Sequence, residues 1–222
     1  MERIATPAPA GAKPKLLVLG ATGGTGRHIV SQAVERGYDV AVLARSAEKA
    51  SKLSGATVVV GDALDAAAVR RALKGRDTVV SALGTPASPF REVTLLSSAT
   101  RVLVDAMMAE NVKRLVAITR IGAGDSAGHG GFLFNRLIFP LLLRHVYADK
   151  NRQEAMVRNS GLDWVLVRPS VLNDKTGSGA VRAFTDLTTF KGGTISRSDV
   201  ASFVLDQVTG DEWLHRSPLV TW

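Results

Sequence analysis

The fold of this chain is decided by Lys15-Leu-Leu-Val-Leu-Gly20-Ala-Thr-Gly23-Gly-Thr-Gly26-Arg-His-Ile-Val30, where an apolar run, spaced glycines and a helix-like segment follow one another without interruption. This order is typical of the first strand, turn and helix of a dinucleotide-binding fold. Gly20 allows a sharp turn out of the strand, Gly23 brings bare backbone close to a pyrophosphate, and Gly26 allows tight packing of the helix on the sheet. Because unpaired N–H groups at the helix start would face the phosphates, we expect a cradle made of Gly20, Thr22, Gly23, Gly24, Thr25 and Gly26.

A second segment, Tyr38-Asp-Val-Ala-Val-Leu-Ala-Arg45-Ser46, ends an apolar run in a cation. In dinucleotide-binding folds the residue about twenty positions beyond the glycines reads the adenosine ribose. An acidic residue there binds the 2′-hydroxyl of NAD, whereas the guanidinium of Arg45 matches the 2′-phosphate of NADP. The residue type predicts NADP(H) as cofactor, and the alternative is a solvated arginine at a strand end.

Strand and helix patterns alternate along the chain, which predicts an α/β fold: a Rossmann-type, doubly wound parallel sheet with helices on both faces, in a single domain. The runs Thr57-Val-Val-Val60, Thr78-Val-Val-Ser81 and Trp164-Val-Leu-Val167 are continuous, as in strands buried on both faces. The expected strands are 15–20, 38–44, 57–61, 77–82, 114–119 and 163–167. The expected helices are 24–36, 46–53, 64–74, 92–110, 132–144, 147–160 and 197–208.

The composition fits one compact domain, with 222 residues of which 45% are hydrophobic. Residues 1–13 are predicted to be a flexible leader, and residues 14–222 an NAD(P)-binding Rossmann domain with a small C-terminal region on the substrate side. The chain has no cysteine and four scattered histidines. We therefore expect no disulfide framework, no thiolate chemistry and no metal site, and a cytoplasmic location.

The net charge of +8 comes from basic residues spread along the chain, without a basic arm or a run interleaved with aromatics. This distribution favours anionic small ligands and predicts no specific nucleic-acid partner. The most apolar segment, 132–143, is shorter than the roughly 18 residues of a membrane span, so no membrane partner is expected. Its excess of apolar residues suits core, a cavity wall or a subunit interface, which leaves a homodimer open.

Further motifs follow the strands: Gly61-Asp62, Ser81-Ala-Leu-Gly84, Ser160-Gly-Leu-Asp-Trp-Val-Leu-Val-Arg168-Pro169 and Ile195-Ser-Arg-Ser-Asp199-Val-Ala. With the glycine turn and Arg45, the chain resembles atypical, extended-type short-chain dehydrogenases/reductases of the NAD(P)H-binding group that includes NmrA-like proteins and biliverdin/flavin reductases. The resemblance implies that Asp62 lies beside the adenine amino group and that Ala82 to Gly84 cover the adenine and ribose. It assigns to the cofactor site Asp62, Ala63, Ala82, Leu83, Gly84, Thr119, Lys150 and Pro169.

Asp62 has a second interpretation as the N-cap of the following helix. Asp65 is the better cap candidate, because it stands where the helical pattern starts. The carboxyl ends of strands are where ligands bind in open α/β sheets, and this favours the cofactor role for Asp62.

The catalytic positions depart from the usual pattern of this group, which places a Ser on the fifth strand and a Tyr four residues before a Lys. Here Thr119-Arg120 ends the expected fifth strand. The spacing of NmrA-like and isoflavone-reductase-like chains implies that Lys150 is the family lysine, with Glu154 one helical turn later, and that Val146 fills the tyrosine position. Tyr147 lies next to it but is rotated by about 100° on a helix.

The resemblance then implies that Lys150 holds ribose hydroxyls and acts as electrophile or proton donor, and that Thr119 hydrogen-bonds the substrate or the nicotinamide. Tyr147 and Arg120 are the other catalytic candidates. The alternative for Lys150 is a solvated side chain in a charge run with Asp149, Arg152 and Glu154.

Arg120 begins a glycine-rich loop that contains His129 and ends at Gly131. This loop is either a substrate lid, with Arg120 available to an anionic substrate and His129 as a proton carrier, or a flexible surface connection. The leading hypothesis is an NADPH-dependent reductase of a small conjugated or carbonyl substrate, of flavin, quinone, tetrapyrrole or enone type. The rival is a non-catalytic, NADP(H)-binding redox sensor of NmrA-like type, which Val146 favours. Sugar-nucleotide epimerase activity fits less well, because the chain lacks the length for a large substrate domain.

Overall fold

The computed structural model describes residues 13–86, 88, 90–126, 143–190 and 192–222. Its main sheet has eight strands in the order β3-β2-β1-β4-β5-β6-β10-β8, and all neighbours are parallel except β8 and β10. A second, two-stranded sheet pairs β7 with β9. The strands are β1 Lys15–Leu19, β2 Asp39–Ala44, β3 Thr57–Val60, β4 Thr78–Ser81, β5 Arg114–Ile118, β6 Asp163–Pro169, β7 Val171–Asn173, β8 Arg182–Phe184, β9 Thr194–Ser196 and β10 Leu219–Thr221.

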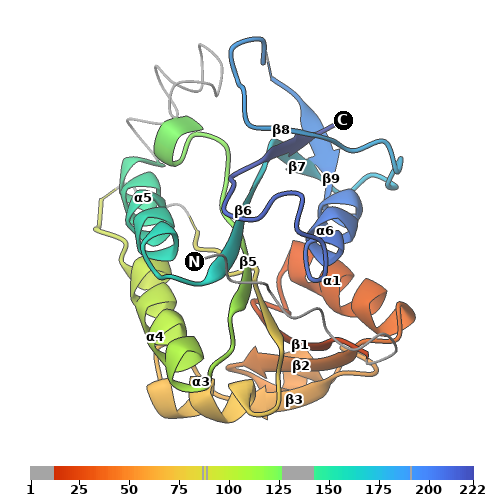
Figure 1. Ribbon diagram of the computed structural model, residues 1–222, viewed down its shortest axis with the longest axis vertical. Coiled ribbons are helices and arrows are strands. Elements are labelled where there is room, and N and C mark those ends of the chain that lie inside the picture. Colours follow the sequence, from red (N-terminus) through yellow and green to blue (C-terminus); the bar gives the residue numbers. More distant parts are fainter. Residues whose placement is uncertain (1–12, 87, 89, 127–142, 191) are drawn as a thin grey trace, which may run out of the picture.

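Helices cover both faces of the main sheet (Figure 1). Helices α1 and α6 pack against each other on one face, while α3, α4 and α5 lie side by side on the other. The predicted doubly wound α/β fold is therefore confirmed. The helices are α1 Gly24–Glu35, α2 Ala47–Ala50, α3 Ala66–Leu73, α4 Leu95–Ala109, α5 Arg144–Arg158 and α6 Arg197–Asp206, with a short 3-10 turn, η1, at Gly124–Ser126.

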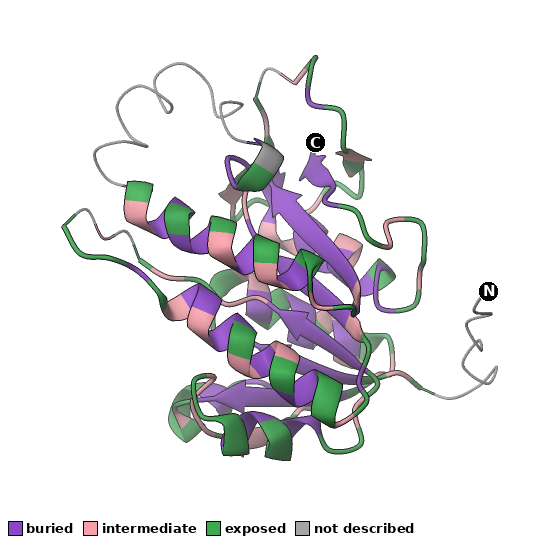
Figure 2. Ribbon diagram, turned by 60° about the vertical axis from the view of Figure 1, so that its left-hand side comes forward, coloured by how far each residue is buried: buried purple, intermediate pink, exposed green. Residues whose placement is uncertain are grey.

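The two cores follow from the alternation of side chains along each strand. In β1, Leu16 and Val18 face the core under α1 and α6, while Leu17 and Leu19 face the core under α3 and α4. A strand whose side chains enter a core on each face of the sheet needs apolar residues at every position, which explains the continuous apolar runs. Figure 2 shows the result, with buried strands inside and helices whose outer faces are exposed.

The interpretation of Thr57-Val-Val-Val60 as a strand buried on both faces is wrong. This segment is β3, the edge strand of the sheet, and Val60 is 53% exposed. The matching interpretations of β4 and of Trp164–Val167 in β6 are confirmed, because all of these residues are buried. An apolar run does not by itself show whether the strand lies inside the sheet or at its edge.

Helix boundaries also differ from the sequence expectations. The segment expected at 46–53 is helical only over α2, and α5 begins at Arg144 rather than at 147. The three-residue strands β7 to β10 were not expected at all. The expected helix at 132–144, apart from its last two residues, lies outside the described residues, as do His129 and the leader 1–13 apart from Lys13. No helix within the described ranges combines the length and the apolar character that a membrane crossing requires.

Candidate functional site

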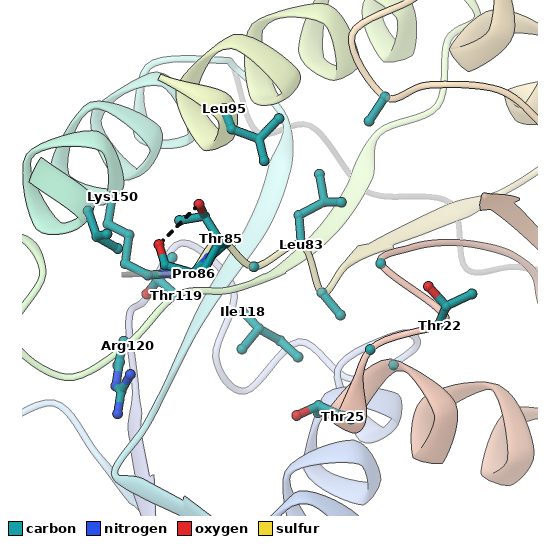
Figure 3. A pocket seen from close by; sticks show the side chains of 18 of the residues that line it. Thr22, Thr25, Leu83, Thr85, Pro86, Leu95, Ile118, Thr119, Arg120 and Lys150 are labelled. Atoms are coloured by element: carbon teal, nitrogen blue, oxygen red, sulfur yellow. Dashed lines mark hydrogen bonds between the residues drawn. The ribbon is translucent and has the colours of Figure 1, made fainter. Parts of the chain in front are cut away.

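A cavity of about 660 Å³ opens at the carboxyl ends of the parallel strands, where the order of the sheet reverses between β1 and β4. This switch point is where open α/β sheets bind ligands. Segments far apart in the sequence meet there, and Figure 3 shows the glycine turn with Thr22 and Thr25 at one end and Lys150, Thr119 and Arg120 at the other. The predicted site residues that line the cavity are Gly20, Thr22, Gly23, Gly24, Thr25, Gly26, Arg45, Asp62, Ala63, Ala82, Leu83, Gly84, Thr119, Arg120, Tyr147 and Lys150.

The glycine turn has the geometry that the sequence predicts. Gly20 has a φ of +77°, and a Cβ there would overlap the backbone carbonyl of Ala82. A Cβ on Gly26 would overlap the carbonyl of Gly20, so α1 packs directly on the turn. The amide of Gly23 donates to the Gly20 carbonyl over 3.0 Å. Only glycine therefore satisfies both the turn and the close approach of the helix.

The N-terminus of α1 suits an anion. Gly23 is the N-cap residue and has no side chain to accept from the first amides, and the first turn holds no acidic residue. The first N–H groups of a helix lack partners within it, and they carry its positive dipole end. The cavity thus presents bare amides and positive potential where dinucleotide-binding folds hold a pyrophosphate, and the residues fit such a ligand.

Arg45 and Asp62 lie on the cavity wall that follows β2 and β3. The side chain of Arg45 is exposed, and it forms no ion pair with any described residue. Asp62 accepts from the amide of Leu64 over 2.9 Å, whereas Asp65 accepts from Ala67 and is the N-cap of α3. The N-cap interpretation of Asp62 is therefore wrong, and its carboxylate sits at the cavity wall.

Lys150 is buried, with 8% of its surface exposed, and it lines the cavity. Burial lowers the pKa of Lys150 to about 8, with Arg120 adding to the shift while Glu154 and Asp149 oppose it. Its ammonium forms no ion pair with a described carboxylate. The interpretation of Lys150 as a solvated side chain is therefore wrong.

The position of Lys150 is fixed by its neighbour Asp149, which is fully buried. The Asp149 carboxylate accepts from the amides of Leu96 and Ser97 over 2.7 and 3.2 Å and from the Ser97 hydroxyl. It thus caps the N-terminus of α4 from α5, in place of a local cap. The two helices are locked together one residue away from Lys150.

A buried polar network lies behind Thr119. The Thr119 hydroxyl donates to Glu154 Oε1 over 2.7 Å, and Arg168 donates to the same carboxylate from Nε over 3.1 Å and from Nη2 over 2.5 Å. Glu154 and Arg168 are 1% and 2% exposed. Because a hydroxyl has one proton, Thr119 can offer only acceptor lone pairs to a ligand in the cavity.

Val146 occupies the position that the usual pattern gives to tyrosine, and Tyr147 is the next residue. Val146 lines the cavity four residues before Lys150, so the tyrosine position holds a hydrocarbon. Tyr147 is 1% exposed and donates its hydroxyl to the carbonyl of Ile121 over 2.9 Å. Burial raises the pKa of Tyr147, and the charge of Arg120 opposes this rise. Its phenol is committed to the backbone, which weighs against a catalytic role.

One predicted cofactor residue lies elsewhere. Pro169 does not line the cavity, because it is buried in β6, where it pairs with Val220 of β10. Sequence reasoning also missed several lining residues, and the charged one among them is Arg197, at the start of α6. The missed lining residues are Leu43, Ala44, Gly61, Thr85, Pro86, Leu95, Ile118, Leu143, Leu172 and Arg197.

Comparison with known proteins agrees with this geometry. The model of a family described as NAD(P)H-binding matches residues 20–211. An uncharacterized sugar epimerase, YhfK of Bacillus subtilis, is 28% identical over 198 residues, 86% of each chain. A (4-alkanoyl-5-oxo-2,5-dihydrofuran-3-yl)methyl phosphate reductase of Streptomyces griseus is 30% identical over 74% of this chain and 50% of its own length. ChuY, an anaerobillin reductase of Escherichia coli O157:H7, shares the fold with a TM-score of 0.80 and 23% identity over 93% of this chain and 96% of its own.

Proposed function

The chain belongs to the NAD(P)H-binding family of oxidoreductase type, and on that premise we propose that it is an NADPH-dependent reductase of a small conjugated or carbonyl substrate. The observation that carries the proposal is a single cavity that joins an anion-binding glycine turn to a buried lysine. When bound, NADPH supplies a hydride to an electron-poor carbon or nitrogen of the substrate. The protein supplies binding, orientation and protons.

The choice of NADPH over NADH rests on Arg45. Its guanidinium stands at the end of β2, exposed and without a described ion-pair partner, where a 2′-phosphate would neutralise it. A planar guanidinium forms paired, charge-assisted hydrogen bonds with phosphate oxygens. No acidic side chain follows β2 at this point to receive the 2′-hydroxyl of NADH.

Lys150 and Thr119 are the polar groups offered to ligands at the end of the cavity away from the glycine turn. The Lys150 ammonium donates to ribose hydroxyls or to the substrate, and its lowered pKa lets it release a proton near neutral pH. The Thr119 hydroxyl, which donates to Glu154, accepts from an N–H or O–H of the ligand. The two side chains thus present one donor and one acceptor on the same wall.

The substrate class follows from the remaining wall. Pro86, Leu95 and Val146 contribute hydrocarbon to the lining, and Figure 3 shows Pro86 and Leu95 on the side of Lys150. Such a wall suits a planar, partly apolar acceptor. Arg120, with no described ion-pair partner, suits an anionic group on that acceptor.

The test is loss of NADPH absorbance with a panel of flavins, quinones, tetrapyrroles and enones. The proposal expects turnover of at least one acceptor, with Lys150→Ala and Thr119→Val lowering kcat more than NADPH affinity. The matched control is Arg70→Ala, which changes an exposed arginine of α3 that does not line the cavity. Turnover of none of these acceptors by a protein that binds NADPH would contradict the reductase proposal.

A second candidate function is a non-catalytic NADP(H) sensor. The observation that favours it is the hydrocarbon of Val146 in the tyrosine position, with the Tyr147 hydroxyl held by the Ile121 carbonyl. A sensor would bind NADPH without turnover and would capture a protein partner in proportion to the ratio of NADPH to NADP. Pull-downs at fixed ratios of the two forms separate this function from the reductase.

A further inference from the structure

We propose that Arg197 is a cofactor-binding residue that contacts the pyrophosphate of the dinucleotide beside Gly24, and that Asp174 competes for it. The inference rests on the proposed function, because it assigns a further contact within the same cavity. Arg197 stands in the segment Ile195-Ser-Arg-Ser-Asp199-Val-Ala, but it was not among the predicted site residues. It lies more than 170 positions beyond the glycine turn in the sequence but beside it in space.

The backbone of Arg197 is held firmly. It is the first residue of α6 and follows β9 directly, and the Ser196 hydroxyl caps the helix by accepting from the Asp199 amide over 2.9 Å. Helix α6 packs along α1, where Gln32 donates to the carbonyl and hydroxyl of Ser198 over 3.0 and 3.1 Å. These contacts fix the start of α6 against the C-terminal half of α1.

The side chain of Arg197 covers the first residue of α1. A Cβ built on Gly24 would lie 2.7 Å from Arg197 Nε and 2.9 Å from its Cδ. Glycine at this position therefore makes room for the arginine as well as for a ligand. Arg197 and Gly24 both line the cavity, so the guanidinium reaches the wall of the phosphate cradle.

The electrostatics of this arrangement call for an anion. Arg197 is a cation at the N-terminus of α6 and beside the N-terminus of α1, and both helix ends carry positive partial charge. Cations are favoured at helix C-termini, so two N-termini and a guanidinium repel one another unless a negative group lies between them. The first turn of α1 has no acidic residue. The first turn of α6 holds Asp199, but its carboxylate accepts from the amides of Ser178 and Gly179 and from the indole of Trp222, and it forms no ion pair with Arg197.

The one described carboxylate paired with Arg197 is a weak competitor. Asp174 Oδ1 lies 2.9 Å from Arg197 Nη1, but its side chain is 82% exposed. Exposed ion pairs contribute little, because water screens them and both side chains lose freedom. A pyrophosphate held by α1 offers several oxygens and a larger charge, so it outcompetes Asp174 for the guanidinium.

The experiment is calorimetric titration of the full chain with NADPH and with NADH. Arg197→Gln should weaken both by about tenfold, the scale of one lost charge-assisted hydrogen bond, because both cofactors carry the pyrophosphate. Asp174→Asn should tighten both roughly twofold to fivefold by releasing Arg197. This gain should vanish in the double variant.

The matched control is Arg70→Gln, which removes the same charge from an arginine of α3 that pairs at the surface with Glu110, the C-cap residue of α4. Melting curves of each variant report whether it folds. If Arg197→Gln and the Arg70→Gln control bind NADPH and NADH equally well, the cofactor-binding role of Arg197 is overturned. A lowered melting temperature of Arg197→Gln in that case would assign it a structural role only. Failure of the unaltered chain to bind either cofactor would instead overturn the proposed function together with this inference.

Discussion

Replacement of Arg168 by methionine is predicted to destabilise the protein strongly. The guanidinium donates to both oxygens of Glu154, over 3.1 and 2.5 Å, and the two side chains are only 3% and 2% exposed. In Arg168→Met the carboxylate keeps the Thr119 hydroxyl at 2.7 Å and a longer ion pair with Arg158 at 3.6 Å. Removing one partner of a buried pair costs about 3 to 5 kcal/mol, because the other charge stays buried.

The assay is urea unfolding, supported by calorimetric melting. For a chain of this length each kcal/mol lowers Tm by roughly 2 to 4 °C, so the predicted loss is about 6 to 20 °C.

Two controls isolate the pair. Arg168→Met with Glu154→Gln removes both charges and should recover much of the lost stability. Arg70→Met breaks an exposed pair with Glu110 and should cost no more than about 1 kcal/mol. A loss in Arg168→Met no larger than that of Arg70→Met, or a double variant no more stable than the single one, would refute the reasoning.

Three further predictions concern the cavity. Gly20→Ala should lower the free energy of unfolding by at least about 1 to 3 kcal/mol and abolish NADPH binding, because φ is +77° and a Cβ would overlap the Ala82 carbonyl. A variant with an unchanged melting temperature and unchanged NADPH affinity in calorimetry would contradict this. Turnover should fall as pH rises through about 8, where Lys150 loses its proton, and Lys150→Arg should move the fall to higher pH; an unchanged kcat profile would exclude Lys150 as the titrating group. The free energy of unfolding should rise as pH increases from about 8 to the ordinary lysine pKa of 10.5. In this range Lys150 keeps its proton in the unfolded chain and loses it in the folded one. Urea unfolding should show this rise in the unaltered chain and not in Lys150→Met.

The sequence allowed prediction of the parts of the site that depend on local geometry. Gly20 is required by a turn, and Gly26 by the close packing of α1, which begins four residues after Gly20. Their spacing, between an apolar run and a helix-like segment, identifies them. Val146, Lys150 and Glu154 lie at intervals of four residues on one helix, which places them along one face. The parallel fold followed in the same way from alternating strand and helix patterns.

The rest depends on packing between distant segments. Arg197 reaches Gly24 only because α6 packs on α1, and Asp149 caps α4 only because α5 lies beside it. A charged residue on a helix gives no sign of such a partner, so Asp149 entered the sequence interpretation only as a member of the charge run in the alternative for Lys150. Strand order decides that β3 is an edge strand, and the three-residue strands β7 to β10 are too short to carry a period.

The most direct test of the central claim is calorimetric titration of the unaltered chain and of Arg45→Ala with NADPH and NADH. The account predicts that the unaltered chain binds NADPH at least about tenfold more tightly than NADH. Arg45→Ala should lower NADPH affinity roughly tenfold to a hundredfold and leave NADH affinity unchanged, because only NADPH carries the 2′-phosphate. Equal affinity for both cofactors, or an Arg45→Ala variant that binds NADPH as the unaltered chain does, would contradict it.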